Sequence, residues 1–167
     1  MYVDLDDSFT AEGWINWARS QGAVAEVVCG TYASGKGGWK LVLDSTGATP
    51  VVRLHAAGAF PVSVLADGVL MADASSLEGE WHHLALRYDT AFGNGVWSLL
   101  VDGVAAGSVT NAWRPSSIFD RAEFRLGAFD GDASFAGGYD MWRISRGIRT
   151  VDDILWVIPS GTTVIFR

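Results

Sequence analysis

The chain has 167 residues, of which 49% are hydrophobic and 19% charged, with 20 glycines and 8 tryptophans. This length fits one domain with a sizeable core, and many glycines and aromatics with few charges are typical of an all-β protein rich in tight turns. A net charge of −7 and a pI near 4.7 argue against nucleic acid as a partner, because nucleic-acid-binding proteins usually present a basic face.

Alternating strand patterns dominate the chain, and helical periodicity is nearly absent. Asn94-Gly95 and Asp102-Gly103 are the clearest hairpin signals, and a further turn is expected at Asp67-Gly68. Only residues 150–155 look helical, with Thr150 expected to cap one turn. Closely spaced strands without intervening helices predict antiparallel sheets packed as a sandwich. The expected strands cover residues 9–17, 24–30, 39–44, 51–57, 61–67, 81–89, 96–102, 104–110, 123–128 and 139–145.

Cys29 is the only cysteine, so no intrachain disulfide can form, and we expect this residue to be buried on a strand. The chain carries no signal-peptide pattern and no apolar run as long as about 18 residues, so we expect no membrane insertion. We expect the protein to be extracellular or virion-associated, either after removal of a leader or by reaching its site without one.

Four segments carry a resemblance to a known family: SFTAEGWINW (8–17), EGEWHHLALRYD (78–89), WSLLVDGVAAG (97–107) and SFAGGYDMWRIS (134–145). In their order and spacing they resemble the laminin-G-like domains of the concanavalin A-like lectin and glucanase superfamily, over most of residues 2–155. The resemblance implies an all-β fold, an antiparallel two-sheet jelly-roll β-sandwich that binds ligands more often than it transforms them. The matching positions are Trp14, Trp81, His83, Leu84, Ala85, Val101, Asp102, Gly103, Gly138, Asp140, Arg143 and Ile144.

The two ends of the chain depart from the family pattern. Residues 1–167 are expected to form a single domain, but the family's usual strand before Tyr2-Val3 has no counterpart here. Residues 156–167 run past the family's last helical turn and alternate again. We therefore expect a C-terminal extension in which residues 162–167 form a strand beside the first strand or with a neighbouring subunit.

Catalytic patterns are absent from the sequence. Glycoside hydrolases of this fold need two carboxylates that flank the scissile bond, and the chain has no Glu-x-Asp-x-Glu strand to supply them. The resemblance places Glu78 and Glu80 in a turn. His82 and His83 are adjacent, so on a strand they face opposite sides and cannot chelate one metal together. The resemblance makes His83 a structural hydrogen-bonding residue beneath Trp81. We therefore predict that the protein is not an enzyme.

Carboxylates in a glycine-rich loop favour a calcium site, because hard cations bind several oxygen ligands from loops. Asp130 and Asp132 lie in such a loop, and Asp140 resembles the family's near-invariant aspartate. The resemblance implies a structural calcium at one edge, which Asp4 or Asp6 is placed to approach. The predicted metal ligands are Asp130, Asp132, Asp140 and Asp4; the alternative is that these aspartates end turns and bond backbone amides.

Loop aromatics are the candidates for carbohydrate contact, because sugars stack on exposed aromatic rings beside polar groups. Trp113 and Arg114 precede a proline in a polar segment and are the first choice. Tyr32 and Phe92 also lie in glycine-containing loops. The predicted ligand-binding residues are therefore Trp113, Arg114, Tyr32 and Phe92; the alternative is that such rings fold back over a sandwich edge.

One basic cluster interrupts the acidic chain. Arg143, Arg146 and Arg149 lie close to three aspartates that offset their charge. A solvated edge is the favoured interpretation of this cluster, and an anion site is the alternative.

The leading functional hypothesis is a non-catalytic recognition module that binds carbohydrate or a glycosylated surface, or acts in adhesion. The alternative is a structural protein of a virion or surface array, such as a capsid decoration or tail adhesin, that forms homo-oligomers or larger assemblies through its C-terminal strand or loop aromatics. A mean hydropathy of +0.20 favours the alternative, because apolar surface is often covered by a partner.

Overall fold

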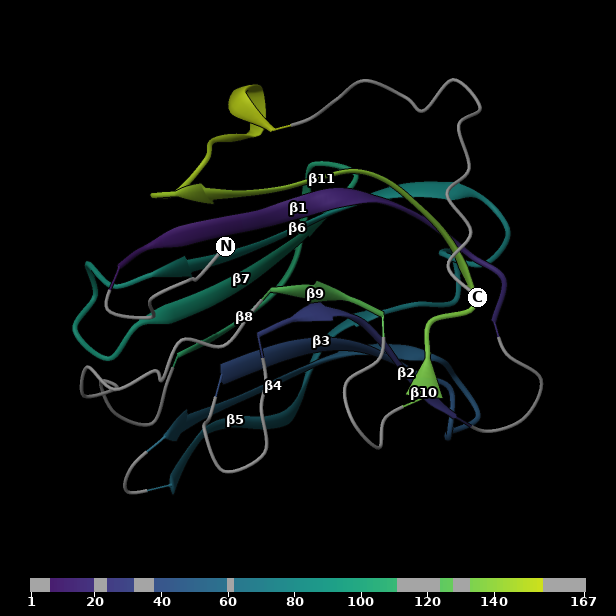
Figure 1. The fold of residues 1–167 in the computed structure, drawn as a ribbon, viewed down its shortest axis with the longest axis horizontal. Helices are drawn as coiled ribbons and strands as arrows, with labels where there is room; N and C mark the ends of the chain where they lie inside the picture. Colours follow the sequence, from purple (N-terminus) through teal and green to yellow (C-terminus); the bar gives the residue numbers. More distant parts are fainter. Residues whose placement is uncertain are drawn as a thin grey trace.

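Two β-sheets stack face to face in the computed structural model (Figure 1). The five-stranded sheet has the order β11-β1-β6-β7-β8, and the six-stranded sheet has the order β10-β2-β3-β4-β5 with β9 paired to β2. All these pairs are antiparallel except β10 with β2, which is parallel. The predicted all-β sandwich is confirmed. The structure describes residues 7–19, 24–31, 38–59, 62–110, 124–127 and 133–154.

The strands follow the alternating segments of the sequence closely, and one short 3-10 helix, η1, comes after the last of them. Their bounds are β1 Phe9–Trp17, β2 Ala25–Gly30, β3 Gly38–Asp44, β4 Val51–Ala59, β5 Val62–Asp73, β6 Trp81–Asp89, β7 Val96–Val101, β8 Val104–Thr110, β9 Arg125–Leu126, β10 Ala133–Ser134, β11 Gly137–Arg146 and η1 Val151–Asp153.

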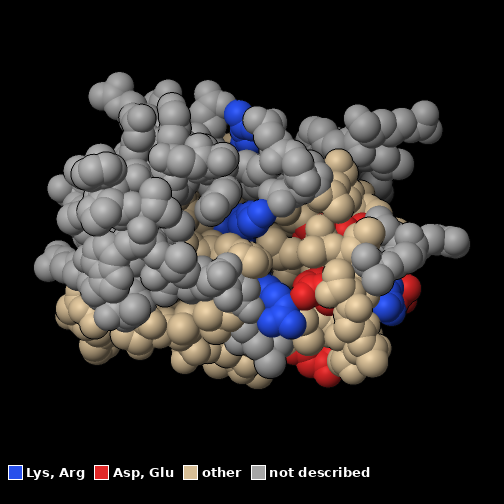
Figure 2. Space-filling view, turned by 90° about the horizontal axis from the view of Figure 1, so that it is seen from below, with Lys and Arg blue, Asp and Glu red and all other residues tan. Residues whose placement is uncertain are grey.

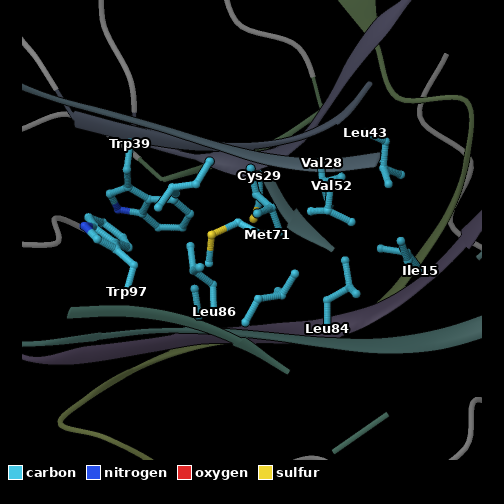
Figure 3. Close-up of a cluster of buried hydrophobic side chains, with 14 of the residues drawn as sticks. Ile15, Val28, Cys29, Trp39, Leu43, Val52, Met71, Leu84, Leu86 and Trp97 are labelled. Carbon is cyan, nitrogen blue, oxygen red and sulfur yellow. The ribbon is translucent and has the colours of Figure 1, made fainter. Parts of the chain in front are cut away.

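The core lies between the two sheets, and aromatic side chains fill one end of it (Figure 3). Trp39 of β3 and Trp97 of β7 come from opposite sheets, and their ring centroids are 6.1 Å apart. Phe9 of β1 stacks on Trp39 at 5.4 Å. The other labelled residues, including the buried Cys29, continue the core between the sheets, so the expected burial of the cysteine is confirmed. Burial raises the pKa of the Cys29 thiol, which keeps it protonated.

One hydrogen bond crosses the sandwich from a buried tyrosine. The Tyr139 hydroxyl of β11 donates to the Val28 carbonyl of β2 at 2.9 Å. Burial raises the pKa of Tyr139, so the hydroxyl keeps its proton and donates throughout the physiological range. The bond satisfies a buried polar group and links the two sheets.

A β-bulge interrupts the pairing of β1 with β11 in the five-stranded sheet. The pairing steps from Glu12 with Arg143 to Trp14 with Asp140, so Gly13 faces two residues of β11. The Trp142 ring lies where a Cβ on Gly13 would be, with its nearest atom 2.5 Å from that position. Only glycine therefore fits at the bulge without moving the ring.

The turns agree with the sequence in two places and differ from it in a third. Asp102 and Gly103 form the β7–β8 hairpin, both with positive φ, and Gly95, also at positive φ, ends the β6–β7 connection. The turn expected at Asp67-Gly68 is wrong, because β5 continues through it and pairs with β4, with several register shifts. Thr150 is the N-cap residue of η1, as expected, but its hydroxyl donates to the Asp153 carboxylate rather than accepting from a backbone amide.

Two expectations about the chain ends lie outside the described residues. These are the C-terminal strand over residues 162–167 and the match at Tyr2-Val3. Among the described residues, no helix has the length and apolar character that a membrane span requires.

Candidate functional site

The outer face of the six-stranded sheet carries a group of polar side chains on its central strands. Alternate residues of β3 and β4 belong to the core, so the residues between them face outward. Lys40 of β3 pairs directly with His55 of β4, and Arg53 of β4 pairs with Val42. Arg53 also reaches Asp44, with 2.6 Å between its Nε and the carboxylate Oδ2. Figure 2 views this side of the molecule and shows basic and acidic side chains interspersed where the surface is described.

The carboxylates of this face are held by their own turns. Thr46 donates its backbone N–H and its hydroxyl to Asp44, at 2.9 and 2.5 Å, and these bonds together with Arg53 hold the pKa of Asp44 below its ordinary value. Asp73, at the end of β5, accepts a 2.7 Å bond from the Ser75 backbone N–H, and its hydrogen bonds with Ser75 lower its pKa as well. Both aspartates are therefore ionised at neutral pH.

The outer face of the five-stranded sheet is different, because it contains a buried acid paired with a half-buried arginine. Glu12 of β1 is 0% exposed and accepts a 2.8 Å bond from Nε of Arg143, whose Nη2 bonds the same carboxylate oxygen. The His83 Nε2 lies 3.4 Å from the other oxygen of Glu12. Arg143, from the basic cluster interpreted as a solvated edge, stays 34% exposed while it neutralises a buried acid.

Apolar packing closes another part of this second face. Ala85 of β6, Leu100 of β7 and Ile154 form a buried cluster separate from the main core. Ile154 directly follows η1, which lies above the five-stranded sheet in Figure 1. The chain after β11 thus folds back over this sheet, whereas the polar residues of β3 and β4 stay half-buried on theirs.

The two histidines have different roles. The His83 ring packs edge-on against Trp14, with centroids 5.3 Å apart. The His82 Nδ1 lies 2.7 Å from the Asp102 carboxylate, whose other oxygen accepts the His83 backbone N–H at 2.8 Å. Asp102 therefore ties the β7–β8 turn to the start of β6.

One predicted ligand-binding residue lies within the described structure. Phe92, in the turn between β6 and β7, is 70% exposed, so it does not fold back over the sandwich edge. The other three, Tyr32, Trp113 and Arg114, lie outside the described residues.

One predicted calcium ligand can also be placed. Asp140 lies in β11 opposite Trp14 and is half-buried. Asp4, Asp130 and Asp132 lie outside the described residues. Among the residues that the structure describes, no three His, Cys, Asp or Glu side chains come together as a metal site would require.

Glu12 and the Lys40–His55 pair were not among the site residues predicted from the sequence. Alternation was the available signal: Glu12 stands between inward-facing residues of a clear strand, and so do Lys40 and His55. Their partners come from strands whose register the sequence does not show.

Comparison with known proteins identifies the family. Residues 2–155 match a laminin G domain family of the concanavalin A-like lectin/glucanases superfamily. The chain belongs to this family. Among curated proteins, no sequence matches it significantly.

Solved structures with the same fold include carbohydrate-binding proteins. An inferred carbohydrate-binding protein from Bacteroides ovatus ATCC 8483 is 21% identical with a TM-score of 0.59, and the match covers 90% of this laminin G-like chain but 40% of that protein. The module CBM40 of the Ruminococcus gnavus IT-sialidase, bound to α2,3-sialyllactose, is 14% identical with a TM-score of 0.52 and coverages of 87% and 79%. An endo-1,3-β-glucanase from Streptomyces sioyaensis is 12% identical with a TM-score of 0.44 and coverages of 83% and 63%. At these identities the likeness to the first two structures establishes the fold alone.

Proposed function

We propose that this laminin G-like domain is a non-catalytic module that binds carbohydrate on the outer face of its six-stranded sheet. The observation that carries the proposal is the group of half-buried donors and acceptors on β3 and β4, centred on the Lys40–His55 pair. Sugar hydroxyls need several such groups fixed on a rigid surface, and a central strand pair provides that rigidity. The carbohydrate-binding proteins that share this fold support the same conclusion.

The state of the acids on this face supports binding without hydrolysis. A glycosidase needs one carboxyl group with a raised pKa as general acid. The pKa values of Asp44 and Asp73 are both lowered, and each carboxylate bonds residues of its own turn. Among the described residues of this face, neither aspartate suits the role of proton donor.

A glycan and polysaccharide binding screen tests this proposal. The wild-type domain is expected to bind at least one glycan, and the double variant Lys40→Ala/His55→Ala is expected to lose that binding with its fold intact by circular dichroism. Arg146→Ala is the matched control, because Arg146 is exposed at the end of β11 in the other sheet. Full binding by the double variant would exclude the β3–β4 face, and binding lost in Phe92→Ala would place the site at the loops instead.

The same screen, repeated with calcium and with a chelator, tests the predicted calcium site. Binding that needs calcium would support the aspartate ligands proposed from the sequence. Equal binding in both conditions would contradict a calcium requirement.

An assembly role is the second candidate, and the observation in its favour is the edge strand β8. This strand ends the five-stranded sheet, and Val104 at its start is 69% exposed. Edge strands pair readily with other chains. Light scattering during size-exclusion chromatography is expected to give a multiple of 17.9 kDa if the protein assembles, and 17.9 kDa at high concentration would exclude self-assembly.

A further inference from the structure

Two arginines on the outer face of the five-stranded sheet have donors that are shielded from water and have no acceptor. These are Nε and Nη2 of Arg87 on β6 and Nε of Arg149 in the segment after β11. Guanidinium groups stay charged in proteins, and a buried donor without a partner loses its hydration without compensation. Such donors are rare in folded proteins and call for an explanation, of which a bound ion is one.

Thr10 of β1 brings the two arginines to the same place on the sheet. Arg87 is the direct strand partner of Thr10. The Thr10 hydroxyl accepts a 3.0 Å bond from the backbone N–H of Arg149 and donates one of 3.0 Å to the Gly147 carbonyl. Arg149 is therefore anchored above Thr10, and Arg87 extends from the strand beside it.

The carboxylates near Arg87 and Thr10 bond other groups: Asp89, two residues along β6 from Arg87, accepts the Ala91 backbone N–H at 2.9 Å. Glu12, two residues along β1 from Thr10, is held by Arg143 and lies next to His83. Asp153 accepts the Thr150 hydroxyl. Burial lowers the pKa of Arg87, and the negative charge of Glu12 acts in the opposite sense without satisfying its donors. Glu12 therefore bonds Arg143 and leaves the shielded donors of the neighbouring Arg87 without an acceptor.

We propose that Arg87 and Arg149 form an oxyanion-binding site above Thr10 that takes a carboxylate, sulfate or phosphate group. The planar fork of an arginine matches the oxygens of such groups and gives strong charge-assisted hydrogen bonds. One oxyanion between the two guanidinium groups satisfies donors on both. The site lies on the opposite sheet from the proposed carbohydrate surface and does not depend on it.

NMR titration of the whole chain with sodium sulfate, sodium phosphate and sodium glucuronate tests the site, with chloride used to keep the ionic strength constant. The Nε–Hε signals of Arg87 and Arg149 are expected to shift and saturate with at least one of the three anions. Preference for glucuronate points to an acidic saccharide as ligand, and preference for sulfate or phosphate points to an inorganic or esterified oxyanion. Absence of a saturable shift with all three would overturn the proposal.

Substitutions of the two arginines distinguish a loss of anion binding from a loss of folding stability. Arg87→Met and Arg149→Met are each expected to weaken anion binding about tenfold or more, because each removes charge-assisted hydrogen bonds. Neither should lower the Tm in chloride buffer, since the donors that are lost had no acceptor. Arg87→Lys and Arg149→Lys keep the charge without the fork and should also bind more weakly, which covers a methionine variant that fails to fold. Arg19→Met is the control, because Arg19 follows the end of β1 that lies away from Thr10. Anion affinity equal to wild type in the Arg87 and Arg149 variants would overturn the proposal.

Discussion

Glu12 shows how a single buried acid organises the surface around it. A carboxylate without exposure loses its hydration, so it needs both a counter-charge and hydrogen bonds. Arg143 supplies two bonds from β11, and His83 approaches from β6. The acid on β1 thereby connects the two strands that flank it.

Arg143→Met tests this pair by removing the counter-charge. The variant is expected to lose about 3 kcal/mol of unfolding free energy, because Glu12 becomes a buried charge without its partner. Urea denaturation at neutral pH measures the loss. The double variant Glu12→Gln/Arg143→Met should recover a large part of it, and a double variant as unstable as the sum of the single variants would show that the two residues do not interact.

The bulge glycine gives a second prediction at this scale. Gly13→Ala is expected to cost about 1–3 kcal/mol, because the new methyl group displaces the Trp142 ring. Gly47→Ala is the matched control, since its nearest neighbour to a Cβ is the Thr49 carbonyl oxygen at an ordinary 3.7 Å. Thermal unfolding of both variants makes the comparison, and equal Tm values would contradict the close packing at the bulge.

The lowered pKa of Asp44 predicts how the stability of the protein depends on pH. Hydrogen bonds from Thr46 and the charge of Arg53 lower its pKa in the folded state, so its stabilising effect is present above the unfolded pKa of about 3.9 and is lost as the pH falls through the folded value. The difference in stability between wild type and Asp44→Asn should be constant from about pH 5 to 8 and shrink below about pH 4. Urea denaturation across this range measures it, and a difference that persists at the acid end would contradict the assignment.

At the level of strands, pairing between strands determines the strand bounds and register that local sequence patterns do not. The four resembling segments predicted β1, β6, β7 and β11, because each alternates and ends in turn residues. Asp67-Gly68 has the composition of a turn, yet pairing along β4 carries β5 through it. The contact between Glu12 and Arg143 spans 131 positions of sequence, and a bulge shifts its register, so strand patterns alone do not reveal it.

Two glycines in the β6–β7 connection test how tightly this turn packs against the sandwich. Gly93 and Gly95 both have positive φ, but only Gly95 lies against a side chain, with the Tyr88 hydroxyl oxygen 2.4 Å from the position of a Cβ. Gly93→Ala should cost about 1 kcal/mol through backbone strain. Gly95→Ala should cost about 1–3 kcal/mol more, since it adds a clash with a buried ring. Equal losses in chemical denaturation would mean that the turn tolerates movement of Tyr88.

At the scale of the whole molecule, the sandwich has two outward faces with different chemistry. The five-stranded face holds the buried Glu12 with its Arg143 partner and the apolar cluster that contains Ile154. The six-stranded face presents donors and acceptors from its central strands. The predicted fold is confirmed, whereas the polar surface of β3 and β4 depends on the strand register that places Lys40 beside His55.

Mapping a bound glycan on the protein tests the central claim most directly. A glycan identified in the screen is titrated into the ¹⁵N-labelled domain, and the backbone amide shifts are followed. The largest shifts are expected on β3 and β4 around Lys40, Arg53 and His55, with little change on β1 and β11. Shifts confined to the loop around Phe92 or to the five-stranded sheet would contradict it.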